Sequence, residues 1–207
     1  MRESMTQIHL IRHGQTEWNA SLRVQGHSES ALTDSGRKQA MDLGNKLCHI
    51  RYDVAYSSSS TRAYETAELI LNGSLKDIHE LDSLKEINLG IWEGMRYSDV
   101  ETKYPDQFKC FFKDPSKFKV NGGETFHQLQ SRAVRSLETI VEKNRGKKII
   151  LVSHGMFIRS LLAFIENRSL KDLWSTPTVH NCSQSIVEER NSSYKIIMYA
   201  DSYNWDQ

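Results

Sequence analysis

The sequence has little of what marks several common classes of protein. Only three of its 207 residues are cysteines, at positions 48, 110 and 182. Thiols so few and so widely spaced do not indicate a disulfide framework or a zinc cluster. No apolar run approaches the ~18 residues that a membrane-spanning helix needs. In the first residues, MRESMTQIHLIRHG, the apolar run before the next charged residues is too short for a signal peptide. These absences predict a cytoplasmic protein with reduced cysteines and no membrane contact.

An excess of charge of one sign is also missing. The chain has 27 Lys and Arg residues against 26 Asp and Glu residues, a net charge of +1, whereas domains that bind nucleic acid are usually clearly basic. Nucleic acid is therefore not expected as a partner. Hydrophobic residues make up 38% of the chain, which is enough to bury a sizeable core. With no internal repeat or low-complexity segment, residues 1–207 are expected to form a single domain.

Short apolar runs alternate with helical patterns along the chain. This alternation predicts an α/β fold, a three-layer α/β/α sandwich whose central sheet is mostly parallel and covered on both faces. A hairpin pattern with Asn191 and Ser192 near its turn predicts one antiparallel strand near the C-terminus. Strands are expected within residues 8–11, 52–58, 77–84 and 147–153, and helices within residues 33–50, 61–71, 124–144 and 156–167.

In one segment the hydrophobic residues follow neither the helical period nor the strand period. Residues 97–120 are aromatic and basic, and the run Asn121-Gly122-Gly123 ends them. We expect short helices here that form a cover, as an insertion around residues 95–122. The aromatic residues expected to pack beneath this cover are Tyr104, Phe108, Phe111, Phe112 and Phe118.

Polar clusters follow three of the expected strands. Arg12-His13 ends one strand, Ser57–Arg62 follows another, and His154-Gly155 ends a third. In open α/β sheets, ligands bind outside the carboxyl ends of the strands. We therefore expect the three clusters to converge in one cleft.

The residue types in these clusters point to a phosphoryl group. Two imidazoles and two guanidiniums at one edge would repel one another without an anion between them, and guanidinium forks match phosphate oxygens. The helix N-terminus after serines 57–60 would add backbone donors and a favourable dipole. Each residue taken singly has a plainer interpretation, because a lone histidine is more often structural and an arginine can be half of an ordinary ion pair.

A phosphoryl group beside a histidine indicates nucleophilic catalysis by imidazole. The leaving oxygen then needs a proton, and a carboxylic acid is the usual donor. Glu86 and Glu93, both in the aperiodic loop KEINLGIWEG, are the candidates. Either could equally be a solvated surface residue, so this reasoning leaves the choice open. The serine run is an alternative nucleophile, although helix capping explains it more simply.

Five motifs occur in order along the chain: LIRHGQTEWN, SSSSTRAYETA, EINLGIWEG, GGET and VSHG. Together they resemble the histidine phosphatase superfamily, also called the phosphoglycerate mutase-like family. The match extends from about residue 8 to residue 155. The NCS sequence at 181–183 is also similar to the residues that lead into a late strand in the family. The resemblance implies phosphoryl transfer through a phosphohistidine.

The resemblance implies a role for each matching residue. His13 would be the nucleophile, with the Gly14 carbonyl orienting its ring. Glu86 would be the general acid and base, which leaves Glu93 a structural role. The catalytic set would be Arg12, His13, Arg62, Glu86 and His154, with His154 protonated, and the residues binding the substrate's phosphate would be Arg12, Asn19, Gln25, Gly26, Arg62, His154 and Gly155. No metal or other cofactor is expected, because side chains supply all the cations.

Within such a family, a phosphatase that acts on a small phosphate monoester is favoured. The chain is short, and residues 97–120 lack the arginine pair that glycolytic mutases use for a second acid group. A mutase-like phosphotransferase is the alternative, and a non-catalytic regulatory protein is a more remote one because every catalytic position is filled. The expected partner is a small phosphorylated metabolite, such as a sugar phosphate, a nucleotide-like ester of the α-ribazole phosphate kind, a phosphoglycerate or phosphoserine. The chain is expected to be a monomer or a homodimer.

Overall fold

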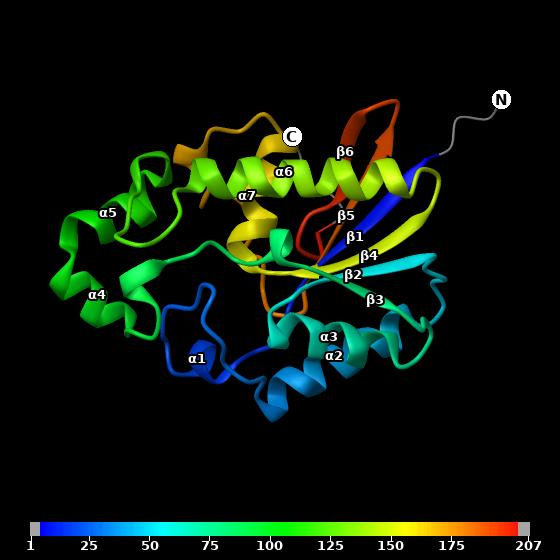
Figure 1. Cartoon of the computed structure of the whole chain (residues 1–207), viewed down its shortest axis with the longest axis horizontal. Coiled ribbons are helices and arrows are strands. Elements are labelled where there is room, and N and C mark those ends of the chain that lie inside the picture. The colour runs from blue at the N-terminus through cyan, green and yellow to red at the C-terminus, as the bar shows by residue number, and fades with distance from the viewer. Residues whose placement is uncertain (1–4, 203–207) are drawn as a thin grey trace.

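The computed structural model describes residues 5–202 of the chain. A six-stranded sheet with the strand order β3-β2-β4-β1-β5-β6 forms its centre (Figure 1). The neighbouring pairs from β3 to β1 are parallel, whereas β5 is antiparallel to both β1 and β6, so only β5 runs against the others. The strands are β1 (Thr6–Arg12), β2 (Val54–Ser58), β3 (Ile78–Leu81), β4 (Lys148–Ser153), β5 (Gln184–Arg190) and β6 (Ser193–Met198). The predicted mostly parallel sheet with one antiparallel strand is confirmed.

Helices cover both faces of this sheet, as the alternating pattern predicted (Figure 1). They are α1 (Glu17–Ala20), α2 (Asp34–Leu47), α3 (Thr61–Leu71), α4 (Tyr97–Lys103), α5 (Pro105–Lys113), α6 (Phe126–Lys143) and α7 (Gly155–Ile165). Short 3₁₀ turns are η1 (Asp82–Leu84), η2 (Gly90–Trp92), η3 (Pro115–Lys117) and η4 (Leu170–Asp172). No helix within residues 5–202 is long and apolar enough to cross a bilayer.

Two hydrophobic cores lie on opposite sides of the sheet, because successive strand residues point to opposite faces. In β1, Ile8 and Leu10 pack in the core beneath α6 and α7, whereas Ile11 packs in the core beneath α2 and α3. In β4, Ile149 and Ile150 divide in the same way. The prediction that residues 1–207 form one domain includes termini outside the described residues and stays a prediction.

Helix boundaries follow the capping signals in the sequence. Thr33 precedes α2, and its side chain accepts a hydrogen bond from the Gly36 N–H, which satisfies a backbone donor that the helix itself leaves free. Asn72 ends α3 in the left-handed conformation, with φ of 43°, as asparagine does at many helix ends. The turn of the β5–β6 hairpin lies at Asn191 and Ser192, both with positive φ. These boundaries agree with the predicted ones.

The expected cover contains α4 and α5, which lie at one end of the sheet (Figure 1). Phe111 and Phe118 are buried there and pack against the ring of Trp92, with ring centroids 5.7 and 5.0 Å from it. Phe112 is 39% exposed at the edge of this cluster. Most of these aromatic residues therefore hold the cover to the rest of the protein.

Candidate active site

The three polar clusters meet at the carboxyl edge of the sheet. Strands β2, β4 and β1 are adjacent, with Arg12 opposite Ser153 in register. Backbone pairing continues past the strand, since the His13 N–H donates to the Ser153 carbonyl at 2.9 Å. The rings of His13 and His154 consequently lie with their centroids 5.2 Å apart. The predicted convergence is confirmed.

A cavity of about 260 Å³ opens at this edge. Its lining includes predicted residues from β1, α3 and the connecting loops, whereas Gly26, His154 and Gly155, also predicted to bind the phosphate, are not among the residues that line it. Gly155 begins α7 beside Arg12, and a Cβ placed on it would lie 3.4 Å from the Arg12 Nε, an ordinary van der Waals contact. The lining residues are Arg12, His13, Asn19, Leu22, Arg23, Gln25, Arg62, Glu86, Tyr97, Met156 and Asn181.

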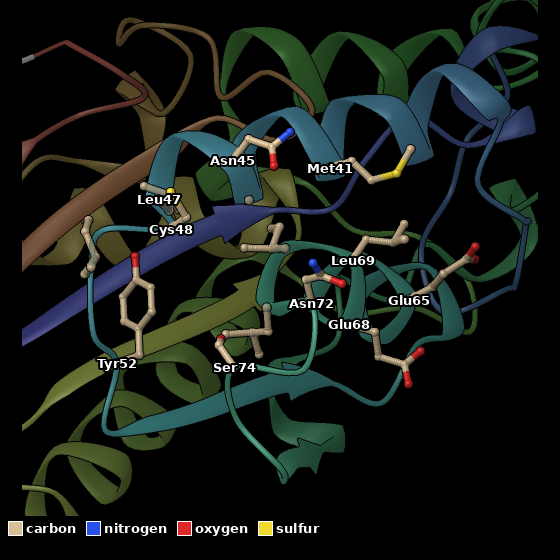
Figure 2. A pocket seen from close by; sticks show the side chains of 14 residues that line it. Met41, Asn45, Leu47, Cys48, Tyr52, Glu65, Glu68, Leu69, Asn72 and Ser74 are labelled. Carbon is tan, nitrogen blue, oxygen red and sulfur yellow. The ribbon is translucent and has the colours of Figure 1, made fainter.

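A larger hollow lies elsewhere and has different chemistry. This pocket, of about 550 Å³, lies between α2 and α3. Figure 2 shows Met41 and Leu69 along its sides and Glu65 and Glu68 at one end. Among residues 5–202 no arginine, lysine or histidine lines it, and its two carboxylates would repel a phosphate. The cavity at the sheet edge is therefore the candidate site.

The imidazole of His13 keeps one ring nitrogen free. Its Nδ1 lies 2.7 Å from the Gly14 carbonyl oxygen, and because a carbonyl only accepts, Nδ1 carries the proton and the Nε2 lone pair is free. Burial, together with the charges of Arg62 and Arg12, holds the pKa of His13 well below its usual value. The ring is therefore neutral at neutral pH, as attack on phosphorus requires. The Gly14 carbonyl therefore contacts the ring as predicted, and the catalytic role of His13 stays a prediction.

Several buried donors around the cavity have no acceptor. Arg12 donates to the Val179 carbonyl, and Arg62 donates to the Gly26 carbonyl at 2.7 Å, yet Nε of both guanidiniums has no hydrogen-bond partner among residues 5–202. The same is true of the buried Nε2 of Gln25. An unsatisfied buried donor typically costs ~1–3 kcal/mol. An anion in the cavity could accept these bonds, and phosphate oxygens match guanidinium geometry.

His154 holds Arg62 in place. Its Nδ1 lies 3.2 Å from an Arg62 Nη, which can only donate, and its Nε2 lies 2.8 Å from the Ser58 hydroxyl. Burial and the neighbouring Arg62 charge keep the pKa of His154 well below its usual value. The expectation of a protonated His154 is therefore wrong for this arrangement, because a neutral ring is needed to accept from Arg62.

The serine run has another role than the predicted capping. Ser60 occupies the N-cap position of α3 but its side chain makes no capping hydrogen bond. Ser58 instead contacts His154, and the Thr61 N–H donates to a carboxylate oxygen of Glu29 at 3.3 Å. The expectation that this helix N-terminus supplies donors for the phosphate is accordingly not met at Thr61, and the contribution of α3 to the cavity lining is the Arg62 side chain.

Glu86 is the carboxyl group that lines the cavity. Its two oxygens accept the N–H groups of Ile87, Met156 and Phe157, the last two from the start of α7. Burial raises the pKa of Glu86 and outweighs these hydrogen bonds and the nearby guanidiniums, which lower it. A raised pKa suits a general acid, because it keeps the carboxyl protonated at higher pH.

Glu93 instead ties two loops together. Its oxygens accept the N–H groups of His27, Ser28 and Leu89. Burial raises the pKa of Glu93, but these hydrogen bonds outweigh burial and leave the pKa below its usual value. A Cβ at Gly26 would collide with this carboxylate, which explains the glycine. The structural role predicted for Glu93 agrees with these contacts.

Sequence reasoning missed other residues around the site. Asn181, in the NCS motif, lines the cavity and donates to the His13 carbonyl and to the Asn19 side chain. Arg132 donates to the Glu86 carbonyl at 3.0 Å and forms a two-pronged ion pair with Glu124 of the GGET motif. The NCS and GGET motifs were noticed in the sequence, but nothing in the sequence indicated that Asn181 and Arg132 make these contacts. The cavity residues without any signal are Leu22, Arg23, Tyr97 and Met156.

A sequence model of the histidine phosphatase superfamily (branch 1) matches residues 8–202. The chain belongs to this superfamily. It is 33% identical over 97% of its length to a metal-independent phosphoserine phosphatase of Arabidopsis thaliana, covering 84% of that protein. It is 31% identical to phosphoserine phosphatase 1 of Hydrogenobacter thermophilus, over 93% of this chain and 92% of that one. A probable phosphoglycerate mutase, GpmB of Salmonella choleraesuis, is 29% identical over 92% of this chain and 88% of its own length.

Solved structures agree with this assignment. YhfR of Bacillus stearothermophilus superposes with a TM-score of 0.92 at 35% identity, covering 95% of this chain and 97% of that one. A mutant phosphoserine phosphatase of Entamoeba histolytica, in complex with phosphoserine, superposes with a TM-score of 0.84 at 25% identity, covering 97% of this chain and 100% of that one. The histidine phosphatase fold inferred from the ordered motifs is therefore confirmed.

Proposed function

We propose that this protein is a phosphatase that hydrolyses a small phosphate monoester through a phosphohistidine on His13. The observation that carries the proposal is the free Nε2 of a neutral His13 in one cavity with the unsatisfied N–H groups of Arg12, Arg62 and Gln25. A nucleophile and an oxyanion-binding set on the same small cavity fit phosphoryl transfer.

The reaction has two steps. In the first, Nε2 of His13 attacks phosphorus, the bond from phosphorus to the ester oxygen breaks, and Glu86 gives its proton to the leaving alcohol oxygen. In the second, ionised Glu86 takes a proton from a water molecule whose oxygen attacks phosphorus; the bond from phosphorus to Nε2 breaks, which releases inorganic phosphate and restores neutral His13 and protonated Glu86. Arg12 and Arg62 stabilise the charge on the equatorial oxygens in both transition states. Within residues 5–202 no group of three histidine, cysteine or acidic side chains is placed to hold a metal ion, and the mechanism uses none.

The relatives guide the choice of substrate. Two curated relatives above 30% identity are named phosphoserine phosphatases, and similar structures carry phosphoserine or 3-phosphoglyceric acid. Phosphoserine and 3-phosphoglycerate are therefore the first esters to test. We further propose that the protein acts in the cytoplasm as a monomer or homodimer.

The test is release of inorganic phosphate from a panel of phosphate esters by the purified protein. Hydrolysis that is lost in His13→Ala supports the proposal. The probable mutases among the relatives make phosphoryl transfer between positions of a phosphoglycerate the second candidate. Transfer to 2-phosphoglycerate faster than release of phosphate would favour that candidate.

A further inference from the structure

Arg132 of α6 binds the loop that carries Glu86, and its side chain is saturated with hydrogen bonds. It makes five of them, as many as a guanidinium has N–H groups. Three go to the backbone carbonyls of Ser83, Lys85 and Glu86, at 3.0, 2.7 and 3.0 Å. The other two go to the two carboxylate oxygens of Glu124, at 3.0 and 2.7 Å. The guanidinium has no N–H left for a ligand, so its contribution lies in the groups that it holds.

Glu124 extends this hold along the chain past Glu86. One of its carboxylate oxygens accepts the Asn88 N–H at 2.9 Å, and its own N–H donates to the Asn88 carbonyl at 2.8 Å. The side chains of Arg132 and Glu124 are only 19% and 22% exposed, and a two-pronged pair of this kind has a fixed geometry. The pair therefore grips the loop before, at and after the residue proposed as the general acid.

The backbone at Glu86 needs such support. Residues 86–89, between η1 and η2, lie in neither a helix nor a strand. The Glu86 carboxyl is anchored by N–H groups at the start of α7. Its carbonyl is anchored from other elements, by Arg132 of α6 and by the His27 ring, whose Nε2 lies 3.0 Å from it. The anchors at the carbonyl and at the carboxyl together fix how the side chain enters the cavity.

The position of this carboxyl matters for the chemistry. Proton transfer needs the two heavy atoms within ~2.6–3.2 Å of each other, and a displacement of about 1 Å can slow an enzyme ~100-fold. The charge of Arg132 is paired with that of Glu124, so we expect Arg132 to act on Glu86 through position and not through its field.

We propose that Arg132, together with Glu124, is a positioning residue that holds the Glu86 carboxyl where it can protonate the leaving oxygen. The inference rests on the proposed function, in which Glu86 is the general acid, and adds a residue outside the cavity to it. Neither Arg132 nor Glu124 is among the residues that line the cavity. An effect of Arg132 on catalysis therefore has to pass through another residue.

The test is how the effect of Arg132→Gln depends on the leaving group. The variant loses the fork, so the Glu86 backbone is free to move. We expect kcat/KM to fall by ~10–100-fold on an alkyl phosphate, whose leaving oxygen needs the proton. The burst of nitrophenolate from nitrophenyl phosphate should change by less than ~3-fold, because that leaving group needs little acid catalysis. Inhibition by inorganic phosphate should be unchanged, because Arg12 and Arg62 still bind the anion.

A double variant separates positioning from general loosening of the fold. In Glu86→Gln the proton is already missing, so adding Arg132→Gln should slow alkyl-ester turnover by no more than ~3-fold further. Arg132→Lys keeps the charge but has three N–H groups and no fork, so its loss should lie between those of the wild type and Arg132→Gln. Arg135→Gln is the matched control. It removes an exposed arginine that donates to the Ser131 carbonyl of its own helix, and it should alter turnover of neither ester.

Equal losses on the alkyl ester and in the burst would overturn the proposal, because they would mean that Arg132 only supports the fold. Losses that add in the double variant, or unchanged kinetics in Arg132→Gln, would overturn it as well. If a thermal melt shows that Arg132→Gln does not fold, Arg132→Lys decides by the same comparisons.

Glu86→Gln alone, with trapping of phosphohistidine on His13, tests the proposed function in the same experiment. A Glu86→Gln variant without selectivity between the esters would contradict both the general acid and its positioning. A selective Glu86→Gln beside an unselective Arg132→Gln would contradict the positioning role alone.

Discussion

Replacing Glu86 by glutamine keeps the shape of the side chain but removes its transferable proton. The carboxylate accepts the Phe157 and Ile87 N–H groups on one oxygen and the Met156 N–H group on the other. A glutamine has one carbonyl oxygen, so its amino group would face one of these donors. We expect the lost bond and the unsatisfied donor to lower the free energy of unfolding by ~1–3 kcal/mol.

Glu93 offers a control with the same pattern. It accepts the His27 and Leu89 N–H groups on one oxygen and the Ser28 N–H group on the other, so Glu93→Gln should lose a similar amount of stability. At this chain length a loss of that size lowers the melting temperature by roughly 2–12 °C. The two variants should therefore differ in chemistry rather than in folding.

The effect of Glu86→Gln on activity should depend on the leaving group. An alkoxide is strongly basic and must be protonated as it leaves, whereas a nitrophenolate can leave without help. General acid catalysis contributes ~10²–10⁴-fold, so the variant should lose a factor of that order on alkyl phosphates. It should lose much less in the phosphorylation step with nitrophenyl phosphate.

The assay is stopped-flow release of nitrophenolate, read as the burst that precedes hydrolysis of phosphohistidine, beside steady-state phosphate release from an alkyl ester. Glu93→Gln should show no selectivity between the two esters. Equal losses on both esters for Glu86→Gln, or the selective pattern in Glu93→Gln, would refute the assignment of the general acid.

Two other predictions concern metal ions and acid stability. Activity should survive exhaustive chelation and be inhibited by vanadate, because Arg12 and Arg62 supply the cations; a strict requirement for an added divalent metal, measured as phosphate release, would count against the mechanism. Burial, with a smaller contribution from Lys148, lowers the pKa of His9 to about 4, and its Nδ1 contacts Tyr52 and Gln184. The unfolded chain therefore binds a proton at His9 near pH 6.5 that the folded protein takes up only near pH 4, so the folded state loses stability as the pH falls between these values. Relative to His9→Asn, the wild type should lose about 2 kcal/mol of unfolding free energy between pH 7 and pH 5. Denaturant titrations at both values measure it, and an unchanged difference between the two proteins would contradict it.

Much of the fold could be predicted because its signals are local. Runs such as Ile8–Ile11 mark buried strands by composition, and Thr33 and Asn72 mark helix ends by the hydrogen bonds and backbone angles that they favour. The meeting of Arg12, His13 and His154 followed from one topological rule, that parallel strands end at the same edge.

What could not be predicted depends on contacts between distant segments. Nothing in the sequence pairs residues 22–24 with residues 94–97, so the entry of Arg23 and Tyr97 into the cavity had no signal. The neutral state of His154 also depends on a contact, because it follows from the Nδ1 atom that accepts from Arg62.

The choice between Glu86 and Glu93 also depended on contacts that the sequence does not show. Glu86 and Glu93 lie in one aperiodic loop, and their residue types alone do not distinguish them. What distinguishes them is position in space, since the N-terminus of α7 anchors Glu86 beside the cavity whereas Glu93 faces the backbone of residues 27–28.

The most direct test of the account is to identify the residue that carries the phosphoryl group. The wild-type protein is mixed with radiolabelled substrate, quenched in base within the first turnover, and digested, and the labelled peptide is sequenced. We predict an acid-labile, base-stable label on His13, formed as fast as the first turnover and absent from His13→Ala. A label on one of the serines at 57–60, or continued turnover by His13→Ala, would contradict the central claim.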